Sequence, residues 1–175
     1  MTKIFCRAKK LPSFDLVDQI LKYNPDNGYF FWKTDRGNNK VKDTVAGRIT
    51  STGYIYISID CKSYAAHRLA FLLHTGKDPY PYEVDHINHD KEDNSFKNLR
   101  KATIQQNSSN RQRGSNNSSG HKSIRFMESQ PLNPYFVCIR QKKIGHSLGS
   151  FPTLEAAIEA RDKKGREIYG EFYHP

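Results

Sequence analysis

The sequence lacks the features that would place the chain in a membrane or outside the cell. No apolar run approaches the roughly 18 to 20 residues that span a bilayer. The first residues, MTKIFCRAKKLPSF, lack the apolar core of a secretion signal. The three cysteines, at positions 6, 61 and 138, are odd in number and far apart. They argue against a disulfide framework, exclude paired CxxC zinc knuckles and favour a reducing compartment.

Negative charge is in short supply, and the excess of positive charge is distributed unevenly. The 175 residues have a formal net charge of +10. Residues 1–84 and 111–175 each carry +5, whereas residues 85–110 are neutral. Basic flanks suit a polyanion, because each phosphate that a cation neutralises releases condensed counterions. A membrane surface is the competing polyanion, but the pattern contains no strongly amphipathic basic helix. Nucleic acid is therefore the expected partner, with solubility alone as the alternative explanation of the charge.

The first 80 residues alternate between short helical and extended patterns. Ser13 can cap a helix, because apolar residues recur at helical spacing after it. Residues 29–32 and 53–60 predict strands, the second with isoleucines on one face and polar or tyrosine side chains on the other. Residues 65–74 are apolar on almost every side, which predicts a packed helix that ends at Gly76.

Residues 85–110, DHINHDKEDNSFKNLRKATIQQNSSN, are the most informative part of the chain. They open with an adjacent carboxylate and imidazole, Asp85 and His86, in a short predicted strand. A polar, turn-rich loop follows, and a capping box that begins at Thr103 predicts a helix carrying Asn107. Neighbouring side chains of a strand point to opposite faces. Asp85 and His86 can therefore serve one phosphate if the strand twists or bulges, or if the phosphate lies at its edge.

These residue types suit hydrolysis of a phosphodiester bond. A neutral imidazole, with an ordinary pKa of about 6.5, is a suitable base near neutral pH. Mg²⁺ prefers oxygen ligands and keeps several waters, so one carboxylate and one amide are enough to bind it. Asp85 and Asn107 would form such a pair if the chain between them folds back. Asn98 is expected to tie the loop to the strand through amide bonds to the backbone.

The patterns DHIN, NLR and QN, with AHRLAFLLHTG upstream, resemble the HNH endonucleases of the homing type, whose core is a ββα-metal fold. The resemblance covers residues 65–110. It implies that His86 is the general base and that Asp85 and Asn107 hold a single Mg²⁺ or Mn²⁺ ion. It also implies that Asn98, the central asparagine of the motif, belongs to the catalytic set in a structural role.

The other histidines near the motif leave alternatives open. His89 stands where the family usually has glycine, and we expect it to adopt the same positive φ. His67 either packs in the core at a helix start or approaches a phosphate, and the core is the preferred interpretation. A structural zinc site built from His86 and His89, with His67 or Cys61, is less favoured, because no set of four ligands has ordinary spacing.

The C-terminal part predicts a second, smaller domain. Residues 113–120 have the composition of a flexible linker. Three short strand patterns follow between residues 122 and 151, and Thr153 then opens a helix that Gly170 stops. The segments GHKSIR, YFVCIR and LGSF, with the helical EAA and ARD, resemble an APETALA2-type DNA-binding domain over about residues 120–172. Such a domain lays a three-stranded sheet in the major groove.

The residues expected to contact DNA are basic and lie mainly on this predicted sheet. By the resemblance, Arg125 and Arg140 are sheet arginines that reach bases or phosphates. The expected set includes five further side chains: Lys142, Lys143, His146, Arg68 and Arg111.

Together these patterns predict an α+β chain with a nuclease domain over residues 1–112, its motif at 83–110, a linker over 113–120 and a DNA-binding domain over 121–175. The predicted activity is metal-dependent cleavage of a specific duplex DNA site, with 5′-phosphate and 3′-hydroxyl ends. A monomer or homodimer would act in the cytoplasm, as a phage-encoded or bacterial protein, without a membrane partner. Two alternatives stay open: a DNA-binding regulator with an inactive nuclease core, and a structural or RNA-directed basic module.

Overall fold

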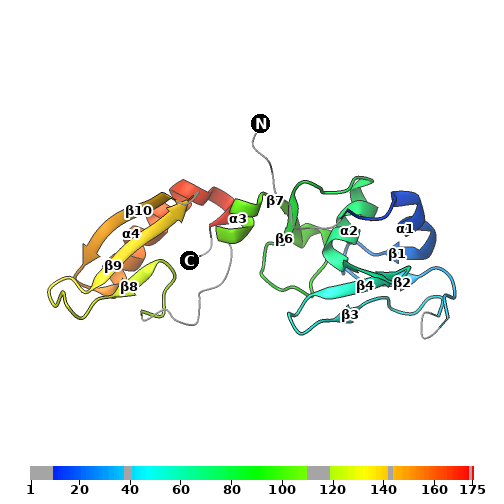
Figure 1. Cartoon of the computed structure of the whole chain (residues 1–175), viewed down its shortest axis with the longest axis horizontal. Helices are drawn as coiled ribbons and strands as arrows, with labels where there is room; N and C mark the ends of the chain where they lie inside the picture. The colour runs from blue at the N-terminus through cyan, green and yellow to red at the C-terminus, as the bar shows by residue number, and fades with distance from the viewer. Residues whose placement is uncertain (1–9, 38–40, 110–118, 142–143, 174) are drawn as a thin grey trace. The chain divides into compact units, whose positions relative to one another are not determined.

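The computed structural model describes residues 10–37, 41–109, 119–141, 144–173 and 175. The chain divides into two compact units, Met1–Thr103 and Ile104–Pro175, and each is described by itself. Both units mix helices and strands, in agreement with the predicted α+β class (Figure 1). Within the described ranges, no helix has the length and apolar character that crossing a bilayer requires.

The first unit is built from three small antiparallel sheets around a central helix. Its elements, in chain order, are α1 (Phe14–Ile20), β1 (Leu21–Tyr23), β2 (Phe30–Trp32), β3 (Arg48–Ile49), β4 (Ile55–Ile59), β5 (Lys62–Ala65), α2 (Ala66–Thr75), β6 (Glu83–His86), the 3-10 turn η1 (Phe96–Asn98) and β7 (Leu99–Ala102). β1 pairs with β2, β4 lies between β3 and β5, and β6 pairs with β7.

Helix α2 is the centre of the core of the first unit. It contacts α1 on one side and β6 on the other, as Figure 1 shows, and also packs on β4 and β5. Leu69 and Ala70 are fully buried, and complete burial of a leucine side chain stabilises a fold by about 1.5–3 kcal/mol. The helix ends at Gly76, whose φ of 72° is left-handed and whose N–H donates to the Leu72 carbonyl. The predicted packed helix and its glycine stop are confirmed.

The other local predictions in this unit are also confirmed. The Ser13 hydroxyl accepts a hydrogen bond from the Leu16 N–H at 3.3 Å and caps α1. β2 and β4 lie within the two predicted strand ranges. Ile57 and Ile59 of β4 are buried at 0% and 1% exposure, because alternate residues of a strand face the same side.

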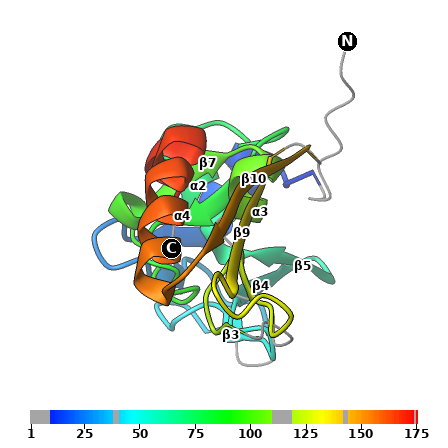
Figure 2. The same ribbon diagram turned by 90° about the vertical axis from the view of Figure 1, so that its left-hand side faces the viewer.

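The second unit is a three-stranded sheet with one long helix. Its elements are α3 (Ile104–Ser109), β8 (Ile124–Phe126), β9 (Tyr135–Gln141), β10 (Ile144–Phe151), α4 (Leu154–Tyr169) and the 3-10 turn η2 (Gly170–Phe172). The strand order is β10-β9-β8, all antiparallel. Figure 2 shows α4 running along one face of this sheet, where Val137 and Ala157 are fully buried. Thr153 caps α4 and the helix ends at Gly170, as predicted.

The division between the units falls at Thr103, before the short helix that carries Asn107. The sequence places the domain boundary later, after residue 112. The difference arises because α3 packs on η2 of the second unit. Residues 110–118, which include most of the predicted linker, lie outside the described residues, so the linker stays a prediction.

Candidate active site

The hairpin of β6 and β7 positions the adjacent carboxylate and imidazole. Its register places Asp85 opposite Arg100 and His86 opposite Leu99. Residues directly opposite each other in an antiparallel pair share a face, and successive residues alternate between faces. Asp85 and His86 therefore leave the strand on opposite sides, as predicted. Both are buried, at 7% and 4% exposure, so the site lies within the packed end of the hairpin.

Asp85 is held by a buried ion pair. Arg100 reaches Asp85 Oδ2 from Nε and from Nη2, each at 3.0 Å. The side chains of Arg100 and Asp85 are 16% and 8% exposed. Removing one partner from a buried pair typically costs about 3–5 kcal/mol, because the other charge is left uncompensated. The pair thus anchors the carboxylate at one orientation, and both contacts use the same carboxylate oxygen.

The imidazole of His86 is oriented by an asparagine of the following loop. His86 Nε2 lies 3.2 Å from Asn94 Oδ1. The amide nitrogen of Asn94 donates to the Glu92 carbonyl at 3.1 Å, so this hydrogen-bond network assigns the oxygen to the side facing His86. Nε2 of His86 therefore carries the proton and donates it, and Nδ1 is left as the basic nitrogen.

The charge state of His86 follows from its surroundings. Burial lowers the pKa of His86 below its usual 6.5, and the hydrogen bond to Asn94 and three nearby carboxylates partly oppose that shift. The imidazole is therefore neutral at neutral pH. A neutral imidazole with one nitrogen protonated and held is the form that a general base requires.

Asn94 is the functional residue that the sequence analysis missed. It is 1% exposed, and its backbone carbonyl accepts a hydrogen bond from the Tyr23 hydroxyl at 2.8 Å. Gly28, in the turn between β1 and β2, has φ of 76°, and a Cβ atom there would lie 2.5 Å from the Asn94 carbonyl carbon. The first hairpin thus presses on the loop that orients His86. The spacing of His86 and Asn94 matches no local rule, so the sequence offered no signal for this contact.

Asn98 fastens the same loop, as predicted. Its Oδ1 accepts from the Asn88 N–H at 3.0 Å, and its Nδ2 donates to the Asp93 carbonyl at 2.8 Å. The amide spans the loop from one side to the other and gives Asn98 a structural role. His89 adopts φ of 64°, which confirms that a histidine can take the turn in which the family usually has glycine.

Two further rings enclose the His86 imidazole. The centroids of the His67 and His86 rings are 5.0 Å apart, with the planes at 75°. The Tyr54 ring lies 6.0 Å from His86 and 5.5 Å from His67. His67 Nδ1 is buried and has no hydrogen-bond partner among the described residues. Burial, followed by the nearby charges of His86 and Arg68, lowers the pKa of His67 to about 3. The preferred expectation, a packed histidine, fits this environment, and a neutral His67 does not repel His86.

The donor groups fit a hard cation better than zinc. Within the described ranges, no three His, Cys, Asp or Glu side chains gather as a metal-binding group, which gives the zinc alternative no support. A site of one carboxylate and one amide oxygen is compatible with Mg²⁺ or Mn²⁺, and Asp85 is the expected carboxylate. Asn107 lies on α3, in the second unit, so its convergence with Asp85 stays a prediction.

Comparison with known proteins finds similarity to one family over this hairpin and the elements before it. Residues 64–109 match the HNH endonuclease family. The chain is 35% identical over 120 residues to an uncharacterized HNH endonuclease, L560, of Acanthamoeba polyphaga mimivirus. That alignment covers 68% of this chain and 60% of the relative. The chain thus spans less than two thirds of the relative's length. These findings support an HNH endonuclease domain in the chain.

A solved structure of DNA binding and cleavage by the HNH homing endonuclease I-HmuI also resembles the chain. The two are 18% identical, with 92% of this chain and 91% of the other covered, and the TM-score is 0.43.

The residues expected to contact DNA differ in where the structure places them, and some lie outside the described residues. Arg68 is 7% exposed and pairs with Asp78 Oδ1 at 3.1 Å. It follows His67 on the core helix α2, so its side chain anchors the fold and is not presented to a ligand. The expected DNA contact of Arg68 therefore does not fit the structure. Arg111, Lys142 and Lys143 lie outside the described residues.

The sheet of the second unit brings two of the expected residues to one face. Arg125 pairs in register with Phe136, and Arg140 lies four residues further along β9, so both arginines share a face and are exposed. His146 lies opposite Ile139, which is 2% exposed. His146 is therefore on the face covered by α4 and is not grouped with the two arginines.

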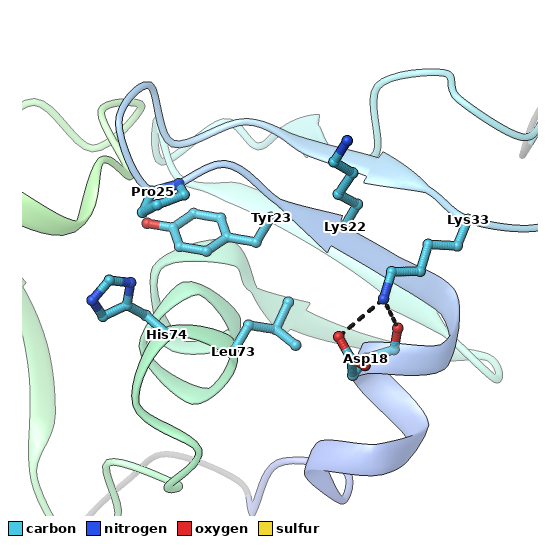
Figure 3. Close-up of a pocket in the computed structure, with 7 residues that line it drawn as sticks. All are labelled: Asp18, Lys22, Tyr23, Pro25, Lys33, Leu73 and His74. Atoms are coloured by element: carbon cyan, nitrogen blue, oxygen red, sulfur yellow. Dashed lines mark hydrogen bonds and ion pairs between the residues drawn. The ribbon is translucent and has the colours of Figure 1, made fainter.

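A separate pocket of about 260 Å³ lies in the first unit. Figure 3 shows its lining: Asp18, Lys22, Tyr23, Pro25, Lys33, Leu73 and His74. Lys33 bonds to the Asp18 carboxylate at 3.0 Å and also to the Asp18 carbonyl. His74 is seven residues after His67 on α2, about 10 Å along the helix. The pocket is thus away from the His86 base, and an ion pair already neutralises one of its cations.

A substitution of Asn94 tests its bond to His86. Asn94→Asp places a carboxylate against the imidazole, which stabilises the protonated form and raises the pKa of His86. If His86 is the general base, cleavage requires its neutral form, so the acid limb of the pH–rate profile should move to higher pH by about one unit. The wild-type limb should lie below pH 6.5, because burial lowers the pKa of His86. Asn27→Asp, in an exposed turn, is the control; equal profiles for both variants would contradict the assignment.

Proposed function

We propose that the chain is a metal-dependent HNH endonuclease that binds a duplex DNA site and hydrolyses its phosphodiester bonds. The observation that carries this proposal is the buried His86, with Nε2 bonded to Asn94 and Nδ1 left as the base, directly after the Asp85 carboxylate in the hairpin.

His86 acts on the attacking water. Nδ1 takes a proton from the water as its oxygen bonds to phosphorus, and the bond from phosphorus to the 3′-oxygen breaks. The 3′-oxygen leaves with a proton supplied by solvent, so the products carry a 5′-phosphate and a 3′-hydroxyl. A positioned base of this kind contributes about 10²–10⁴ to the rate.

A divalent cation would be held by Asp85 and Asn107, with Mg²⁺ or Mn²⁺ as the candidates. When bound, it would stabilise the negative charge of the transition state and of the leaving oxygen. The chain's own contribution is the fixed carboxylate: Arg100 holds Asp85 by one oxygen, and that oxygen cannot swing away from the hairpin without breaking a buried pair.

The second unit would bind the DNA target. Its exposed sheet face carries Arg125 and Arg140, and the unit has the sheet-and-helix arrangement expected of an APETALA2-type domain. Arginine recognises guanine edges and phosphates through paired N–H donors. One catalytic site in each chain favours nicking by a monomer, whereas a homodimer would cut both strands. Action in the cytoplasm stays a prediction.

Arg140→Ala tests this DNA-binding face. The substitution should weaken binding to a target duplex by about 1–3 kcal/mol if Arg140 contacts a base, and should reduce the salt slope by about 1 if it contacts a phosphate. The measurement is fluorescence anisotropy across a salt series. Arg166→Ala is the matched control. Arg166 is 70% exposed on α4, and its substitution removes the same charge. If both variants bind alike, Arg140 has no role in recognition.

Cleavage itself tests the proposed function against the DNA-binding regulator and the RNA-directed module. Incubation of duplex DNA with Mg²⁺ should give product, whereas a regulator would bind tightly without one. Competition between duplex DNA and RNA of equal length, read across salt concentrations, should favour DNA. Preference for RNA with no DNA product would overturn the proposal.

A further inference from the structure

We propose that His67 is a positioning residue for the reaction, and that with Tyr54 it forms a ring holder that fixes the imidazole of His86. The ring holder denotes the His67 and Tyr54 side chains. This inference rests on the proposed function, because it concerns how His86 is kept ready to act as a base. It assigns to His67 on α2 and to Tyr54, directly before β4, a role outside the HNH motif of residues 83–110.

The holder restricts His86 through ring contacts that are additional to its hydrogen bond. Asn94 holds Nε2 at 3.2 Å, which still allows the ring to rotate about that contact. His67 presents its ring at 75° to His86, with centroids 5.0 Å apart. Tyr54 contacts both imidazoles, at 5.5 Å and 6.0 Å between centroids. Edge-to-face and tilted ring contacts at these distances are attractive, and they oppose rotation of the imidazole plane.

The rings of the holder come from rigid parts of the first unit. His67 lies in the first turn of α2, two residues before the fully buried Leu69. Tyr54 directly precedes β4. Lys91, in the loop after His86, stands over the Tyr54 ring with Nζ 4.7 Å from its centroid and donates to the Thr52 carbonyl at 2.8 Å. The loop that follows the base is thereby fastened to the turn that carries Tyr54.

A purely space-filling role for His67 explains less. Its Nδ1 is buried without a hydrogen-bond partner among the described residues, and an unsatisfied polar atom typically costs about 1–3 kcal/mol. An apolar side chain would fill the same space without that cost. What the imidazole supplies to His86 is a flat ring of matching size. A phenyl ring at the same position should supply it too.

The test compares loss of the ring with loss of its nitrogens. His67→Ala removes the ring and should lower kcat for a target duplex by about 10- to 100-fold with KM unchanged, since a small misplacement of a reacting group can cost this much. His67→Phe keeps a ring and should retain kcat within about threefold. His74→Ala is the control, because His74 is exposed on the same helix and should leave kcat unchanged.

A second readout does not depend on cleavage. Long-range ¹H–¹⁵N spectra of the free protein report which nitrogen of His86 is protonated. The wild type and His67→Phe should show a single form with the proton on Nε2, whereas His67→Ala should show exchange between the two forms. If His67→Ala unfolds, Tyr54→Ala and Tyr54→Phe take the place of the two His67 variants. Tyr54→Ala, which removes the ring, should then show exchange between the two His86 forms, and Tyr54→Phe, which keeps it, should show a single form.

The outcomes separate this inference from the proposed function. If His86→Ala abolishes cleavage but His67→Ala keeps wild-type kcat and a single His86 form, the holder is refuted and the nuclease stands. If His67→Phe is as slow as His67→Ala while both are folded, the imidazole nitrogens matter and the holder is refuted as well. If His86→Ala cuts at the wild-type rate, another group is the base and the holder falls with that assignment. The proposed function itself fails if the wild-type protein with Mg²⁺ or Mn²⁺ binds DNA without cutting it.

Discussion

His86→Ala is expected to lower the rate of DNA cleavage by about 10²–10⁴-fold while DNA affinity changes by less than about threefold. The reason is that Nδ1 of His86 is the basic nitrogen of the site, and it lies at a buried position where it adds little to DNA attraction. Single-turnover cleavage of a labelled duplex measures the rate, and a gel-shift assay without Mg²⁺ measures the affinity.

A matched variant controls for the loss of a histidine elsewhere in the unit. His74→Ala removes a histidine from the far end of α2, where the ring stacks on Phe96 at 3.7 Å between centroids. It should cut at the wild-type rate. Thermal unfolding of both variants confirms that each is folded. A folded His86→Ala protein that cuts nearly as fast as the wild type would show that another group acts as the base.

Asp85→Asn is expected to lower the rate of DNA cleavage by about 10²–10³-fold. The remaining rate should no longer depend on the Mg²⁺ concentration over the millimolar range. Asparagine keeps the shape of the side chain but removes the negative charge that a divalent cation requires. It also leaves Arg100 beside a neutral partner, so the free energy of unfolding should fall by up to about 3–5 kcal/mol. Rates across a Mg²⁺ titration, together with thermal unfolding, separate the two effects.

The unit contains a second pair that serves as the control for this substitution. Asp78 pairs with Arg68 at 3.1 Å, and Arg68 is 9% exposed at its side chain. Asp78→Asn therefore breaks a comparable ion pair outside the hairpin. It should lower stability and keep the wild-type response to Mg²⁺. If both variants lose that response equally, the effect of Asp85 is one of stability and the carboxylate is not a metal ligand.

Local rules account for most of the elements that the sequence predicted. Ser13 and Thr153 cap helices because their hydroxyls accept from backbone N–H groups three residues on. Gly76 ends α2 because a left-handed residue is needed there. Each signal lies within a few residues of its effect, so no knowledge of the tertiary structure is required.

The surroundings of His86 depend on contacts that no local pattern contains. Asn94 orients the imidazole from a loop, and Tyr23 holds that loop from 71 residues away in the chain. Tyr54 reaches His86 from the residue directly before β4. These groups are brought together by the packing of three sheets on one helix, and spacing alone gives no indication of them.

The DNA-contact residues show a second limit of pattern analysis. Alternation predicts that Arg140 and His146 lie on strands, but the register of β9 and β10 decides which face each occupies. The charge of Arg68 suggested exposure, whereas its side chain is 9% exposed and pairs with the partly buried Asp78. In both cases the missing information is which surface a neighbouring element covers.

The central claim is that this chain hydrolyses DNA with a divalent cation and His86, and a supercoiled plasmid assay tests it most directly. The wild-type protein with Mg²⁺ should convert supercoiled plasmid to nicked or linear product that DNA ligase reseals without prior kinase treatment, as 5′-phosphate and 3′-hydroxyl ends allow. EDTA or His86→Ala should abolish the conversion. Plasmid that stays supercoiled with Mg²⁺ or Mn²⁺, although the protein binds it, would contradict the account.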